Sequence, residues 1–110
     1  MDEDSTLFVY GILLDPKMRE QVIGRPVEGI AARLPGYERR RGRYFYVVRH
    51  ERGQTEGLLL TGLSARDFER LDQYEEVPAL YTRERVEVIG AKGNAIRCWV
   101  YVPTARLTGE

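Results

Sequence analysis

The chain has 110 residues, a length that predicts one domain, residues 1–110, with a single core. Its composition, 43% hydrophobic and 31% charged, excludes a disordered or fibrous protein, and 17 basic residues balancing 17 acidic ones exclude long-range attraction to nucleic acid or anionic membranes. No apolar run approaches the roughly 20 residues of a membrane span, and the acidic start MDEDST is unlike a signal peptide. We therefore expect a cytoplasmic protein with no nucleic-acid or membrane partner.

The first half of the chain is predicted to contain strands around one helix. A strand over residues 6–13, TLFVYGIL, is followed by a helix within residues 15–24, with Asp15 as N-cap and Gly24 at the stop. The further strands expected here are residues 27–40, broken at Pro35 and Gly36, residues 43–50 and residues 55–63. Because residues 51–54, ERGQ, have turn composition, we expect the last two strands to form a hairpin.

The second half is predicted to contain one helix and two strands. Residues 64–74 have helical periodicity, with Ser64 as N-cap and Asp67 in a capping-box variant. Residues 81–90 and 95–103 alternate as strands on either side of an AKGN turn. Several strands with two segregated helices predict an α+β domain built on a mostly antiparallel, barrel-like sheet.

Glu75 falls on the apolar face of the second predicted helix. At about 100° per residue it lies within roughly 40° of both Phe68 and Leu71. A carboxylate there must be paired, hydrogen-bonded or protonated. Either Glu75 turns outward at the helix end or pairs with Arg83 or Arg85, or it is a partly buried carboxyl with its pKa raised toward neutrality. A general acid or base working at pH 7 requires the second arrangement.

Gly11 interrupts the first predicted strand. Without a side chain, it lets the backbone approach another group closely. The amides of Gly11, Ile12 and Leu13 are then expected to face outward just ahead of the helix at Asp15, where they can hold a carboxylate or a developing oxyanion. The alternative is a β-bulge or a plain strand end.

Three stretches resemble the gamma-glutamylcyclotransferase-like family, which includes AIG2-like and gamma-glutamylamine cyclotransferase proteins. They are LFVYGILL at residues 7–14, LDQYEEVPALYTRERVEV at residues 71–88 and CWVYV at residues 98–102, with TEGLLL at residues 55–60 between them. The resemblance spans essentially the whole chain. It implies a small mixed, mostly antiparallel β-barrel with two main helices, and release of 5-oxoproline from a gamma-glutamyl compound without a metal or organic cofactor.

The same resemblance implies site residues. Glu75 matches the catalytic carboxylate, and the residues that match substrate-binding positions are Tyr10, Gly11, Ile12, Leu13 and Tyr81. In the implied reaction the substrate's α-amine attacks its own γ-carbonyl, so no protein nucleophile is needed; Glu75 is the general acid and base, and the loop amides hold the oxyanion and the α-carboxylate. The alternative is a non-catalytic module of the same fold that binds a small acidic metabolite or a protein partner.

Two residues depart from the family pattern. Ile12 stands where Ser or Thr is common, so a hydroxyl is lost, which matters little if the loop acts through its amides. Glu76 stands where Gly is frequent, and its carboxylate either raises the pKa of Glu75 by repulsion or points to solvent.

The basic stretch ERRRGR, residues 38–43, is interleaved with aromatic residues and is open to three interpretations. It is a nucleic-acid surface, a solvated hairpin whose aromatic side chains pack inward, or a grip for an acidic substrate tail. The neutral overall charge favours the hairpin. The single Cys98 and single His50 exclude an internal disulfide and a Cys/His metal cluster. Cys98 is expected in the core, His50 on the surface and Tyr101 in packing.

Overall fold

A computed structural model describes residues 2–109 of the chain. Its helices are α1 (Pro16–Ile23), α2 (Ala65–Tyr74), α3 (Ala105–Thr108) and 3-10 turns at Glu3–Ser5 and Ile12–Leu14; its strands are β1 (Leu7–Val9), β2 (Gly29–Arg41), β3 (Phe45–Leu60), β4 (Tyr81–Gly90) and β5 (Ala95–Pro103). The strands close a barrel in the order β1-β3-β2-β4-β5, in which β1 pairs parallel with β5 and the other neighbours pair antiparallel. The predicted fold class, a mixed and mostly antiparallel barrel with two main helices, is confirmed.

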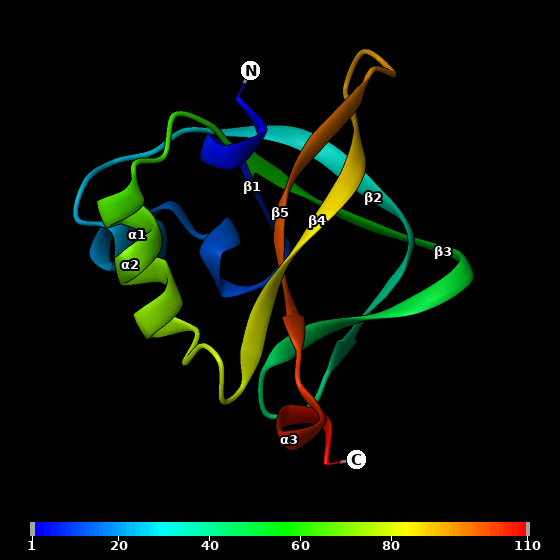
Figure 1. The fold of residues 1–110 in the computed structure, drawn as a ribbon. Helices are drawn as coiled ribbons and strands as arrows, with labels where there is room; N and C mark the ends of the chain where they lie inside the picture. The colour runs from blue at the N-terminus through cyan, green and yellow to red at the C-terminus, as the bar shows by residue number, and fades with distance from the viewer. Residues whose placement is uncertain (1, 110) are drawn as a thin grey trace.

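Strand β1 is buried on both of its faces, which explains why all three of its residues, LFV, are apolar. Phe8 points into the barrel interior with Leu59 and Val100, whereas Leu7 and Val9 belong to a second cluster that the helices cover. Successive side chains of a strand point to opposite faces, so a strand buried on both sides has no polar alternation. Figure 1 shows α1 and α2 side by side on one flank of the barrel.

Both main helices begin at the predicted caps, and α1 also ends at the predicted glycine. The Asp15 side chain accepts from the Lys17 amide at 2.9 Å, and α1 ends at Gly24 in the left-handed region, with φ of 93°. At the start of α2, Ser64 and Asp67 form the reciprocal capping box that the spacing predicts. None of the helices in the described part of the chain has the length and apolar character needed to cross a bilayer.

The predicted first strand was too long. β1 ends at Val9, and residues 12–14 form a 3-10 turn that leads directly into α1. The apolar run continues past the strand because Leu13 is buried under the helices, and the pattern therefore could not distinguish the turn from more strand.

The predicted hairpin was also misplaced. Residues 51–54 lie inside β3, and Pro35 and Gly36 mark a bulge in a continuous β2, so the two long strands pair with each other and turn at residues 42–44. Gly53 is in the strand because it faces this bulge: a Cβ there would lie 2.9 Å from the Tyr37 backbone. The glycine thus permits a close backbone approach instead of a turn.

Candidate functional site

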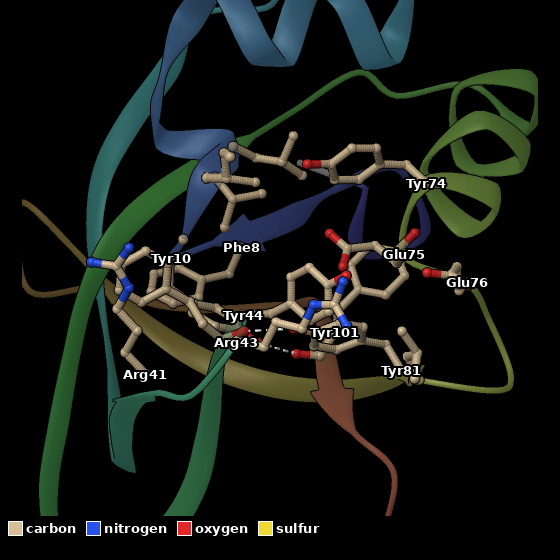
Figure 2. Close-up of a pocket in the computed structure, with 16 residues that line it drawn as sticks. Phe8, Tyr10, Arg41, Arg43, Tyr44, Tyr74, Glu75, Glu76, Tyr81 and Tyr101 are labelled. Atoms are coloured by element: carbon tan, nitrogen blue, oxygen red, sulfur yellow. Dashed lines mark hydrogen bonds between the residues drawn. The ribbon is translucent and has the colours of Figure 1, made fainter. Parts of the chain in front are cut away.

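A cavity of about 400 Å³ opens where the end of β1, the β2–β3 turn and the C-terminal end of α2 meet (Figure 2). This volume suits a small molecule. Its walls are Phe8, Val9, Tyr10, Gly11, Ile12, Leu13, Arg41, Arg43, Tyr44, Phe45, Tyr74, Glu75, Glu76, Leu80, Tyr81 and Tyr101. All six site residues named from the sequence, Glu75, residues 10–13 and Tyr81, therefore lie on one cavity.

Glu75 is the C-cap residue of α2, and its carboxyl faces this cavity. Burial raises its pKa from 4.5 to about 7, and repulsion from Asp72 adds to the rise. A carboxyl with this pKa exchanges a proton readily near neutral pH, as a general acid or base must.

The two arginines considered as partners for Glu75 are engaged elsewhere. Arg83 pairs with Asp72 at 3.0 Å, and Arg85 pairs with Glu3 and Asp4. Within residues 2–109 no basic side chain forms a salt bridge with Glu75. Of the two interpretations, the first, an outward or arginine-paired carboxylate, is wrong.

Asp72 lies one turn before Glu75 in a polar network. Arg83 donates to one of its carboxylate oxygens at 3.1 Å and lies 3.0 Å from the other in an ion pair, and the Tyr101 hydroxyl donates at 2.6 Å. The guanidinium of Arg83 also lies over the rings of Phe68 and Trp99. These contacts hold the Asp72 carboxylate in place, close enough to Glu75 for its charge to raise the pKa of that residue.

The loop that carries Tyr10 and Gly11 is held against the hairpin. The Tyr10 hydroxyl donates to the Tyr101 carbonyl at 2.7 Å, and the Tyr10 carbonyl accepts from Arg39 at 2.9 Å. A Cβ at Gly11 would lie 3.0 Å from Cβ of Phe45. Gly11 therefore allows the close approach expected of it, and the neighbour that requires it is the hairpin residue Phe45.

The 3-10 turn leaves three amides free. The carbonyls of Gly11 and Ile12 accept from Leu14 and Asp15, at 3.0 and 3.1 Å. In contrast, no acceptor within the described residues, 2–109, bonds to the amides of Gly11, Ile12 or Leu13. These donors border the cavity and suit an anionic ligand.

Arg19 supports this turn, and sequence reasoning did not identify it. Only 5% of its surface is exposed, and its guanidinium donates to the carbonyls of Leu13, Leu14 and Val27. With the carbonyls directed inward to Arg19, the preceding amides of the turn are left for a ligand.

Tyr81 joins β4 to the hairpin. Its hydroxyl donates to the Phe45 carbonyl at 2.6 Å, and burial raises its pKa well above the ordinary value. Burial likewise raises the pKa of Tyr10 and Tyr101. All three are therefore neutral side chains at physiological pH, which leaves Glu75 as the proton-exchanging group among them.

The two departures from the family pattern have structural explanations. Ile12 contributes a free amide and lines the cavity, with half of its surface exposed. Glu76 adopts a left-handed φ of 53°, a conformation that glycine takes most easily after a helix. Its carboxylate is exposed, and the repulsion on Glu75 comes from Asp72 instead.

The hairpin residues of the cavity were not selected from the sequence. Arg41, Arg43, Tyr44 and Phe45 surround the β2–β3 turn, so the basic stretch lies on a hairpin, as the second interpretation has it, with Phe45 packed against the barrel core. Arg41 and Arg43 also line the cavity. Gly42 in this stretch could have indicated the turn between the two strands. Because the turn was assigned to residues 51–54, Gly42 was not interpreted in this way.

Comparison with known proteins now shows the family. The model of the family described as gamma-glutamyl cyclotransferase, AIG2-like, matches residues 7–109, and the chain belongs to this family. AIG2-like protein A of Arabidopsis thaliana is 36% identical over 86 residues, which cover 71% of this chain and 52% of that protein. The chain thus spans about half the length of the first curated relatives that it matches.

Solved structures show the same fold. A solution structure of an Arabidopsis thaliana protein matches with a TM-score of 0.83 at 28% identity, covering 96% of this chain and 72% of that one. A structure named gamma-glutamyl cyclotransferase matches with a TM-score of 0.80 at 17% identity, covering 91% and 66%. The second likeness concerns the fold alone.

Proposed function

We propose that this protein is a cyclotransferase that releases 5-oxoproline from a small gamma-glutamyl amine or peptide, without a metal or organic cofactor. The observation that carries the proposal is the placement of an unpaired Glu75 carboxyl, with pKa about 7, on the same cavity as the free amides of residues 11–13. Family membership supports cyclotransferase chemistry in general. The cytoplasmic location remains an expectation from the sequence.

In the proposed reaction Glu75 passes two protons from the attacking nitrogen to the leaving nitrogen. As carboxylate it takes the first proton from the substrate's α-ammonium, and the freed amine attacks the γ-carbonyl carbon to form the ring C–N bond. Glu75 gives this proton to the leaving nitrogen as the C–N bond to it breaks. It then takes the second proton from the ring nitrogen, which becomes the lactam N–H, and gives it to the released amine, which leaves as an ammonium. Proton transfer by a positioned group of matched pKa contributes about 10²- to 10⁴-fold.

The loop amides complete the proposed site. The donors of Gly11, Ile12 and Leu13 hold the α-carboxylate and stabilise the oxyanion that forms on the γ-carbonyl, where loss of one such donor costs about 3 kcal/mol. Because these groups are main-chain amides, an isoleucine at position 12 serves as well as a hydroxyl residue. The walls of Tyr10 and Tyr81 hold the glutamyl chain folded, so that amine and carbonyl meet.

The test measures 5-oxoproline formed from a panel of gamma-glutamyl amines and peptides. We expect turnover of at least one compound and a loss of about 10²- to 10⁴-fold in Glu75→Gln. Glu69→Gln, at an exposed position of α2 outside the cavity, is the matched control that retains activity. Undiminished turnover in Glu75→Gln would refute the catalytic assignment. Binding of these compounds without any product would favour the alternative, a non-catalytic module.

A further inference from the structure

Two arginines of the basic stretch have no structural task in the fold. Arg39 donates to the Tyr10 carbonyl at 2.9 Å, and Arg40 pairs with Glu38 at 3.2 Å. Arg41 and Arg43 instead line the cavity, and Figure 2 shows Arg41 at the end opposite Glu75, with Arg43 between them.

The guanidinium groups of Arg41 and Arg43 are oriented but uncompensated. They lie over the rings of Phe45 and Tyr44, at 5.0 and 5.6 Å from the centroids. Across residues 2–109, neither forms a salt bridge with a carboxylate. Stacking fixes the plane of a guanidinium while its N–H edge stays free, and this edge matches a carboxylate in shape and charge.

Part of the cavity lining is apolar and exposed. Among the large hydrophobic residues that are most exposed in the described chain, Ile12, Tyr44 and Tyr74 all line this cavity, with 50%, 44% and 41% of their surface exposed. Single exposed apolar residues are ordinary, but several that line one cavity indicate a binding surface.

We propose that this side of the cavity selects the leaving amine: Arg41 and Arg43 bind a carboxylate on it, and Ile12, Tyr44 and Tyr74 bind an apolar side chain. The inference rests on the proposed function. In that proposal Glu75 and the loop amides already bind the glutamyl unit, so the arginines are available to bind the other product, the leaving amine. The preferred substrate is then the gamma-glutamyl derivative of an apolar amino acid, and amines without a carboxylate are poor substrates.

Four substrates separate the two recognition elements. Gamma-glutamyl-leucine and gamma-glutamyl-3-methylbutylamide differ only by the carboxylate, as do gamma-glutamyl-glycine and gamma-glutamyl-methylamide. The leucine and glycine compounds differ only by the isobutyl group. We expect kcat/KM to fall about tenfold or more when the carboxylate is removed and about tenfold when the isobutyl group is removed.

Matched variants assign these preferences to residues. The double variant Arg41→Gln, Arg43→Gln should lose the carboxylate preference and keep the isobutyl preference, whereas Ile12→Ser should weaken only the latter. Arg40→Gln removes one positive charge from the same hairpin outside the cavity, and should leave all four kcat/KM values unchanged.

The outcomes distinguish the inference from the function on which it rests. Turnover without a carboxylate preference, or an equal loss on all four substrates in the double variant, overturns the inference while the proposed function stands. If none of the four yields 5-oxoproline, calorimetry on Glu75→Gln decides: tighter binding of gamma-glutamyl-leucine than of its 3-methylbutylamide supports the arginine role. Equal or absent binding overturns it.

Discussion

Asp72 and Glu75 are one helical turn apart, yet they lie in two different regions of the molecule. Asp72 faces the β4–β5 wall, where Arg83 and Tyr101 supply donors to its carboxylate. Glu75 faces the cavity, where burial and the charge of Asp72 raise its pKa to about 7. The same chemical group thus accepts from an arginine and a tyrosine in one region and is an unpaired acid with a raised pKa in the other. Surroundings, and not residue type, determine which role a carboxyl has.

The largest expected effect is on stability, because an ionised Glu75 in the cavity lowers the free energy of unfolding. A carboxyl whose pKa is 4.5 in the unfolded chain and about 7 in the folded one binds more protons when folded. The contribution of Glu75 to the free energy of unfolding is therefore greatest below pH 4.5 and falls as the pH rises to about 7. Glu75→Gln removes this loss. In urea unfolding, its advantage over the wild type should grow from near zero at about pH 4 to on the order of 3 kcal/mol at about pH 8. An advantage independent of pH would contradict the raised pKa.

Breaking the Asp72 region should have a smaller effect on stability. Arg83→Met removes the paired contact with Asp72 and the stacking on Phe68 and Trp99, and should lower the free energy of unfolding by about 1 to 2 kcal/mol. Arg83→Lys, which keeps the charge but not the two-point geometry, should lose less. Equal stability of Arg83→Met and the wild type in denaturant titrations would show that the network contributes nothing.

Asp72→Asn removes the negative charge that lies one helical turn before Glu75, and with it the repulsion on the Glu75 carboxylate. Repulsion from Asp72 is the smaller of the two causes that raise the pKa of Glu75, so the pKa should fall by about one pH unit or less and stay above 4.5. The acidic limb of the pH profile of kcat/KM should move to lower pH by this amount. A movement to higher pH would mean that Asp72 does not act on Glu75 through its charge.

The smallest expected effect concerns the residue after Glu75. Glu76 has a φ of 53°, whereas α1 ends with Gly24 in the same region of backbone conformation. Glu76→Gly should relieve the side-chain cost and stabilise the protein by about 0.5 to 1 kcal/mol, less the greater freedom of glycine in the unfolded chain. Thermal unfolding measures this. A loss of stability would instead indicate that the Glu76 side chain makes a useful contact.

Local patterns were sufficient for much of the fold. The caps at Asp15 and Ser64 and the stop at Gly24 were predicted from the sequence, because a cap bonds to amides only two or three residues away. The position of Glu75 on the apolar face of α2 also follows from helical spacing alone. The resemblance to the family then assigned Glu75 and residues 10–13 to a common site.

Tertiary structure decided which groups are paired and where the long hairpin turns. Whether Arg83 pairs with Asp72 or Glu75, and whether Arg41 and Arg43 face a cavity, depends on distances between segments far apart in the chain. The inclusion of residues 51–54 in β3 depends on a bulge in β2 that faces Gly53, a match between two strands that neither strand shows by itself. Capping and periodicity act within a few residues and can be read from the sequence, whereas ion pairing and strand register are set only when the barrel closes.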